Sequence, residues 1–240
     1  MLPIGSVENI IALRTVVDEL TKAIFGIDLF LVRDRDGLSE KNIDALEKNE
    51  RFRCLPRRHV ENYLLDSEVL SEVAKAFYLP QEQRETSRIL DCLYSIASSI
   101  IMPSVLWNVR EHIQTLGKVP QPSVPNLDKI SRDELAENIS DQITSGLQEV
   151  SKELESSKIH KLVIKEHEKL EAALSRGDWV NILPGKLIFN RFCGEFFHQR
   201  PERVREAYAD IAMRNKPEVF TDIVNILQGF QQSIVLPIPD

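Results

Sequence analysis

The chain is poor in cysteine and contains no long apolar run. Its three cysteines are widely separated, show no paired metal-ligand spacing, and suggest a reducing compartment, the cytoplasm: Cys54, Cys92 and Cys193. No apolar run approaches the roughly 20 residues that cross a bilayer. The first residues contain no basic segment followed by a signal-type apolar core. We therefore expect no membrane partner.

Several catalytic patterns are also missing. No G-x-S-x-G elbow occurs, and the five histidines, including His59, show no metal or triad spacing, so nucleophilic catalysis has no support. Lys186 follows Pro-Gly, but a P-loop needs glycine at the position of Val180 and Ser or Thr at that of Leu187. The net charge of −7 argues against a protein that coats nucleic acid, while a local basic groove stays open.

The strongest positive feature is an apolar segment that ends in two carboxylates, Ile27–Gly37. Its first half has strand character, and Asp34 and Asp36 follow two residues apart. They share a face if the strand continues that far, and ligands of open α/β sheets gather beyond the carboxyl ends of the strands. Two converging carboxylates predict a divalent cation such as Mg²⁺. The alternative is a solvated junction in which Arg33 and Arg35 are ion-pair partners.

The order of elements predicts an α/β fold with a parallel sheet. At 240 residues, the chain is long enough for one large domain or two small ones. Strands are expected at 2–4, 27–33 and 51–55, with helices between them, which is βαβαβ order. A last strand or extended segment is expected at 179–183.

Helical periodicity dominates the remaining segments. Helices are expected at 59–79, 82–116, 131–154 and 159–174, and from 187, 201 and 217. Pro103 should kink the second of these, and prolines make 117–128 a stiff connector. The helices at 131–154 and 159–174 should pack as a hairpin or shallow bundle, with the apolar stripe of the first in a core.

Basic residues supply two further candidates. Four arginines lie between 51 and 58 without an acid among them, and guanidinium groups suit phosphate, so Arg53, Arg57 and Arg58 are candidate nucleic-acid contacts. The alternative is an edge strand protected by charge. Glu61 opens the next helix, where an acid commonly interacts with the helix dipole. Lys186 begins a helix, either as a lysine that faces a phosphate or as an exposed residue.

Four motifs, taken together, resemble the Toprim nuclease module of the OLD (overcoming lysogenisation defect) family of anti-phage proteins. They are Leu2–Asn9 (LPIGSVEN), Leu31–Asp36 (LVRDRD), Arg57–Leu65 (RRHVENYLL) and Leu183–Lys186 (LPGK). The third is the most specific, and the four follow one another in the family's order over most of the chain. The strand that carries the family's first glutamate would precede Leu2 and has no counterpart here. The chain therefore resembles the C-terminal part of a longer ATPase–Toprim protein, or a split or degenerate form.

The resemblance implies a fold and a domain organisation. The fold would be a Toprim-like, Rossmann-like parallel sheet of few strands with a large helical insertion and C-terminal helices. Residues 1–58 and 177–235 would form the core, and 59–176 the insertion. An ABC-like ATPase domain in the same or a neighbouring chain, and a homo-oligomer, would be its partners.

The resemblance also implies an activity, the metal-dependent cleavage of DNA phosphodiester bonds. Asp34, Asp36 and Glu61 would be ligands of Mg²⁺ or Mn²⁺ in a two-metal site, and Lys186 would be the catalytic lysine that faces the scissile phosphate. Two other functions stay open. Asp34-Arg35-Asp36-Gly37 also resembles the nucleophile motif of haloacid-dehalogenase-like phosphatases, although that motif needs Thr or Val at Leu38. The second is a non-catalytic function, in which the chain is a partner or dimerisation module of an ATPase.

Overall fold

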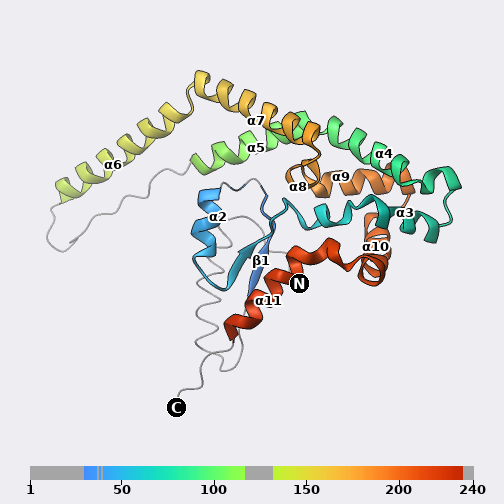
Figure 1. The fold of residues 1–240 in the computed structure, drawn as a ribbon. Coiled ribbons are helices and arrows are strands. Elements are labelled where there is room, and N and C mark those ends of the chain that lie inside the picture. Colours follow the sequence, from blue (N-terminus) through green and yellow to red (C-terminus); the bar gives the residue numbers. More distant parts are fainter. Residues whose placement is uncertain (1–29, 37, 39, 117–131, 235–240) are drawn as a thin grey trace, which may run out of the picture.

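A computed structural model describes residues 30–36, 38, 40–116 and 132–234 (Figure 1). Two short parallel strands, β1 (Leu31–Arg33) and β2 (Phe52–Cys54), pair with Leu31 opposite Phe52 and Arg33 opposite Cys54. Helix α2 (Glu40–Glu47) connects them. The predicted strands and the helix between them are therefore present within the described residues. The predicted strand at 2–4 and helix at 7–25 lie outside the described residues.

The strand pair lies beside two helices (Figure 1), and its side chains are divided between them. Phe52 and Cys54 are buried against Ile43 of α2. On the opposite side, the ring of Phe230 in α11 (Thr221–Ile234) lies 4.5 Å from the ring of Phe30, centroid to centroid, and beneath the Arg53 guanidinium. The period of two along a strand produces this division, and the parallel pairing places the carboxyl ends of both strands at the same edge.

The predicted Rossmann-like α/β fold is wrong. Within the described residues the sheet consists of β1 and β2 alone, and every other regular element is a helix. The predicted strand at 179–183 is the helical turn α8 (Trp179–Ile182). Trp179 and Leu183 are both buried, and the Leu183 amide donates to the Trp179 carbonyl at 3.0 Å. Apolar residues four apart satisfy one helical turn as well as a short strand, so periodicity could not separate the two.

The helices follow the predicted segments but are divided more finely. They are η1 (Val60–Leu64), α3 (Ser67–Ala76), η2 (Gln81–Arg84), α4 (Thr86–Ser99), α5 (Ile101–Leu116), α6 (Arg132–Glu153), α7 (Ser156–Arg176), α9 (Gly185–Phe192), the π-helical η4 (Cys193–Phe197), α10 (Pro201–Asn215) and η5 (Pro217–Phe220). Pro201 and Pro217 start their helices as predicted.

Pro103 lies just after a bend between α4 and α5. The two helices meet at Ile100 with an angle of 49°. Proline lacks the N–H that would continue the hydrogen-bond ladder to Ser99, so the predicted kink is confirmed. Within the described residues, no single helix is long and apolar enough to span a membrane, and the bent α4–α5 pair meets that test only when its two parts are taken together.

The predicted hairpin between α6 and α7 does not form. Helix α7 instead packs along α5, while α6 turns away at Leu154 and projects from the body (Figure 1). The apolar stripe of α6 is only half-buried, and Leu147 is 48% exposed. The predicted core packing of this stripe is therefore not seen. The predicted connector at 117–128 lies outside the described residues.

The main core runs across the expected domain boundary at residue 177. It joins Leu70, Ile89 and Leu93 from the expected insertion with Phe189 and Tyr208 from the C-terminal helices. The strand pair has a separate small cluster with α2. Helices before and after residue 177 thus share one core, and the loop that follows β2 lies between this core and the strand pair.

Candidate functional site

Asp34 and Asp36 lie at the carboxyl end of β1 and both point toward the segment that follows β2. The Val60 amide donates to Asp34 Oδ1 at 2.9 Å, and His59 Nε2 lies 3.2 Å from Asp36 Oδ1. The Asp36 amide donates to the Arg58 carbonyl at 3.0 Å, which ties the two segments together. We call Asp34, Asp36, His59 and Glu61 the acidic edge.

The charge of Asp34 is incompletely compensated. Burial raises the pKa of its carboxyl, and the negative charges of Asp36 and Glu61 raise it further. The hydrogen bond from Val60 and the nearby His59 oppose this shift without cancelling it. A carboxylate whose pKa is raised by neighbouring carboxylates is stabilised by an added cation. The negative charges of Asp36 and Glu61 therefore both act on Asp34.

Asp36 is held in an unusual backbone conformation. Its φ is +47°, in the left-handed region that non-glycine residues adopt infrequently. Burial acts to raise the pKa of its carboxyl, but hydrogen bonds and charge from His59 and Arg33 outweigh burial and hold the pKa below its usual range. Arg33 Nη2 lies 3.2 Å from Asp36 Oδ2. The ion pair with Arg33 that the alternative interpretation expected is thus present.

Glu61 lies in η1 with its side chain buried. Its Oε1 accepts a hydrogen bond from Arg205 Nη2 of α10 at 3.2 Å. The fold thus places Glu61 near enough to raise the pKa of Asp34 and also pairs it with a cation. Glu61 therefore belongs to the acidic edge. To bind a metal ion, its carboxylate would have to leave Arg205 or contact Arg205 and the cation together.

Lys186 reaches the same edge through its backbone. Its amide lies 3.4 Å from His59 Nδ1, and its exposed side chain has no charged partner among the described residues. Asn62, which is fully buried, holds this arrangement. Its side chain donates to the carbonyls of Val180 and Leu183 and accepts from the His59 amide, at 2.7 to 3.0 Å. Three predicted motifs therefore meet at one place.

Gly185 allows α9 to approach η1 closely. A Cβ at this position would lie 2.4 Å from Asn62 Cγ and 2.6 Å from the Asn62 backbone nitrogen. We expect Gly185→Ala to destabilise the protein by about 1–3 kcal/mol, because the rigid η1 backbone must move. Gly194→Ala is the matched control, since a Cβ there meets nothing within 4 Å. Urea unfolding measures both, and equal midpoints would contradict the close approach.

The three arginines proposed for nucleic acid have internal partners. Arg58 is only 4% exposed and donates to Asn108 Oδ1 at 2.8 Å, so its side chain is not available to a phosphate. The Arg57 guanidinium stacks on the Tyr63 ring at 4.3 Å. Arg53 is half-buried, and its Nη1 donates to two backbone carbonyls. The structure therefore uses these groups to join β2, η1 and the helices.

The acidic edge fits a hard divalent cation by donor chemistry. Magnesium commonly binds through one or two carboxylates and keeps several waters. Asp34 and Asp36 supply such carboxylates, and each of their oxygens has a further lone pair beyond the contacts described. Among the described residues, no three His, Cys, Asp or Glu side chains are already grouped as a metal cage. Asp34 and Asp36 thus form the primary pair, with Glu61 beside them.

Sequence reasoning missed His59 and Asn62. His59 was set aside with the dispersed histidines, yet it contacts Asp36 and Lys186. The available signal was its position two residues before Glu61 in the most specific motif, which places it at the start of the same helical turn. Asn62 lies in the same motif but had no role assigned to it, because a buried amide that satisfies three backbone groups is visible only in the fold.

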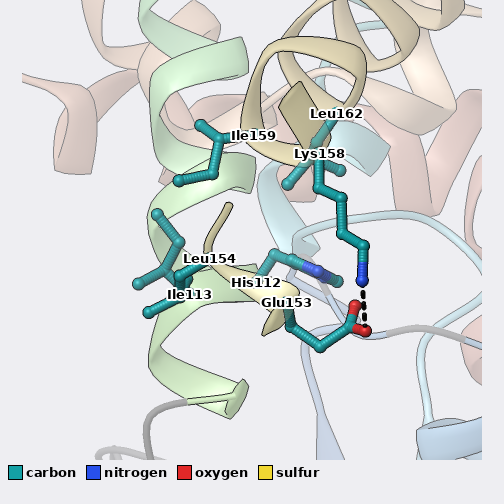
Figure 2. Close-up of a pocket in the computed structure, with 7 residues that line it drawn as sticks. All are labelled: His112, Ile113, Glu153, Leu154, Lys158, Ile159 and Leu162. Carbon is teal, nitrogen blue, oxygen red and sulfur yellow. Dashed lines mark hydrogen bonds and ion pairs between the residues drawn. The ribbon is translucent and has the colours of Figure 1, made fainter. Parts of the chain in front are cut away.

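A small cavity of about 120 Å³ lies between α5 and the bend that joins α6 to α7 (Figure 2). Its wall includes His112 and the ion pair between Lys158 and Glu153, with an Nζ to Oε1 distance of 2.8 Å. None of the acidic-edge residues lines it. The cavity is therefore separate from the candidate site.

No family model, curated protein or solved structure matches the chain.

Proposed function

We propose that the acidic edge is a divalent-cation site for phosphodiester cleavage, with DNA as the substrate class. The observation that carries this proposal is the convergence of four separated sequence positions. Asp34 and Asp36 follow β1, Glu61 follows β2, and Lys186 lies more than a hundred residues later at the start of α9. The resemblance of the same residues to the motifs of OLD-family nucleases supports the choice of substrate.

Each residue has a distinct role in this proposal. Asp34 and Asp36 hold the cation, and Glu61 joins them when it releases Arg205. A bound Mg²⁺ or Mn²⁺ would supply Lewis-acid stabilisation of the negative charge that develops on the phosphate. The exposed Lys186 ammonium places a second positive charge beside the same phosphate. Arg33 keeps Asp36 ionised and oriented.

Nicking of supercoiled plasmid tests the activity. We expect nicking with Mn²⁺ or Mg²⁺ and none with EDTA. Lys186→Ala should reduce the rate by about tenfold or more, because it removes a positive charge from the reacting centre. Lys161→Ala, an exposed lysine on α7, is the matched control and should leave the rate unchanged.

Two results would contradict the proposal. Equal nicking by the wild type and Lys186→Ala would remove this lysine from the reaction. No nicking by the wild type, alone or with an ABC-like ATPase partner, would favour the non-catalytic docking function. The ATPase partner and a homo-oligomeric state belong to the proposal through the family resemblance.

A further inference from the structure

We propose that His59 is the positioning residue that aligns the Asp36 carboxylate with the Lys186 turn. This inference rests on the proposed function. It adds a role for a histidine to which the motif comparison assigned none, and it gives each ring nitrogen a separate hydrogen-bond partner.

The contacts determine which nitrogen carries the proton. The Lys186 backbone N–H points at His59 Nδ1 across 3.4 Å, so Nδ1 is the acceptor. His59 Nε2 therefore carries the hydrogen and donates to Asp36 Oδ1 across 3.2 Å. An imidazole ring with Nδ1 as acceptor and Nε2 as donor satisfies both neighbours at once.

The backbone of His59 is fixed on both sides. Its amide donates to Asn62 Oδ1 at 2.7 Å, and its carbonyl accepts from the Asn62 amide at 3.0 Å. The side chain is itself buried, with a relative exposure of 10%. The ring therefore has little freedom to turn, and it links the end of β1 to the start of α9.

This link has a defined effect on each neighbour. Arg33 donates to one oxygen of Asp36 and His59 to the other, so the carboxylate plane is fixed and each oxygen keeps a lone pair for a cation. Groups that orient a ligand in this way commonly contribute about 10- to 100-fold in metal affinity or activity. On the other side, the Nδ1 contact holds the first turn of α9 and hence the starting point of the Lys186 side chain.

Two substitutions separate the tasks. In His59→Asn the side-chain oxygen takes the place of Nδ1 and still accepts from Lys186, but nothing reaches Asp36. In His59→Gln the terminal amide takes the place of Nε2 and still donates to Asp36, but the acceptor for Lys186 is lost. His160→Gln, an exposed histidine on α7, is the control.

We expect opposite patterns from the two variants. Mn²⁺ affinity, measured from the electron paramagnetic resonance of free Mn²⁺, should fall about tenfold in His59→Asn and stay within about threefold in His59→Gln. At saturating Mn²⁺, His59→Gln should lower kcat for nicking about tenfold with little change in KM. Thermal unfolding of each variant verifies that it is folded. Equal losses in both variants, or no loss in either, would overturn the proposal.

Hydrogen exchange at the Lys186 amide tests the contact with His59 independently of metal binding and nicking. The amide should exchange at least several-fold faster in His59→Gln than in the wild type or His59→Asn, with no cation present. If the wild type neither binds Mn²⁺ nor nicks DNA, the proposed function fails, and the exchange data still decide whether His59 holds the turn. Equal exchange in all three proteins would contradict the link.

Discussion

Asp34→Asn is expected to reduce metal-dependent nicking by about 100-fold or more while making the protein slightly more stable. Loss of a group that only orients a ligand already costs about 10- to 100-fold, so loss of a ligand should cost at least as much. The asparagine oxygen can still accept from the Val60 amide, which leaves the local hydrogen bond intact. The nicking rate at saturating Mn²⁺ is the measurement.

The stability gain follows from the raised pKa of Asp34. The folded protein holds a proton on this carboxyl more tightly than the unfolded chain does, so its stability falls as the pH rises through the region above about 4. Asparagine removes that charge. In EDTA at pH 7 the variant should therefore be more stable than the wild type, and the advantage should vanish at a pH where Asp34 is protonated.

The control for this prediction is Asp44→Asn, an exposed carboxylate on α2. It should change neither the nicking rate nor the stability by a measurable amount. A lower stability of Asp34→Asn at pH 7 would show that the negative charge of Asp34 is structural, and would weaken the assignment of this residue to a cation.

Asn62→Ala is expected to destabilise the protein by about 3 kcal/mol and to uncouple Lys186 from the acidic edge. The substitution leaves two buried carbonyls and the His59 amide without their partner, and each such group costs about 1–3 kcal/mol. Asn62→Asp should be no better, although it has the same shape, because a carboxylate would then face the carbonyls of Val180 and Leu183. Urea unfolding measures both variants.

Asn190→Ala provides the matched control for Asn62. Asn190 is an exposed residue of α9, and its replacement should change the stability by less than about 0.5 kcal/mol. A small effect of Asn62→Ala, similar to that of Asn190→Ala, would mean that the buried amide does not hold η1 against the α8–α9 turn.

The sequence predicted the strand pair because its pattern is strong and local. Leu31–Arg33 and Phe52–Cys54 are short segments that contain Val32 and Phe52, residues favoured in strands, with a polar helix between them, and the parallel pairing follows from that order. The larger sheet was predicted from the βαβαβ order of the expected elements and from the family resemblance. It was wrong within the described residues because a five-residue apolar segment such as 179–183 fits a helical turn equally well.

The candidate site was predicted only in part. The carboxylates after β1 could be placed at a strand end from the local pattern, and the family resemblance assigned Glu61 and Lys186 to the same site. The arginines could not be interpreted, because a guanidinium group suits a phosphate and an internal carbonyl equally, and Arg58 is buried between the strand pair and the helices. The contact of His59 with Lys186 spans more than a hundred residues, and no local pattern encodes it.

The packing of α6 also could not be predicted from the sequence. Its apolar stripe has helical spacing, which predicted a buried face, but spacing does not specify what covers that face. The structure leaves Leu147 half exposed and packs α7 on α5 instead. The length and period of this helix were therefore predictable from sequence, and its partner was not.

The most direct test of the central claim is a Mn²⁺ titration of the wild type and of the Asp34→Asn/Asp36→Asn double variant, followed by electron paramagnetic resonance. We predict saturable binding by the wild type that is lost in the double variant and retained in Asp44→Asn. Equal binding by the wild type and the double variant, with both proteins folded, would show that the carboxyl end of β1 holds no cation and would contradict the account.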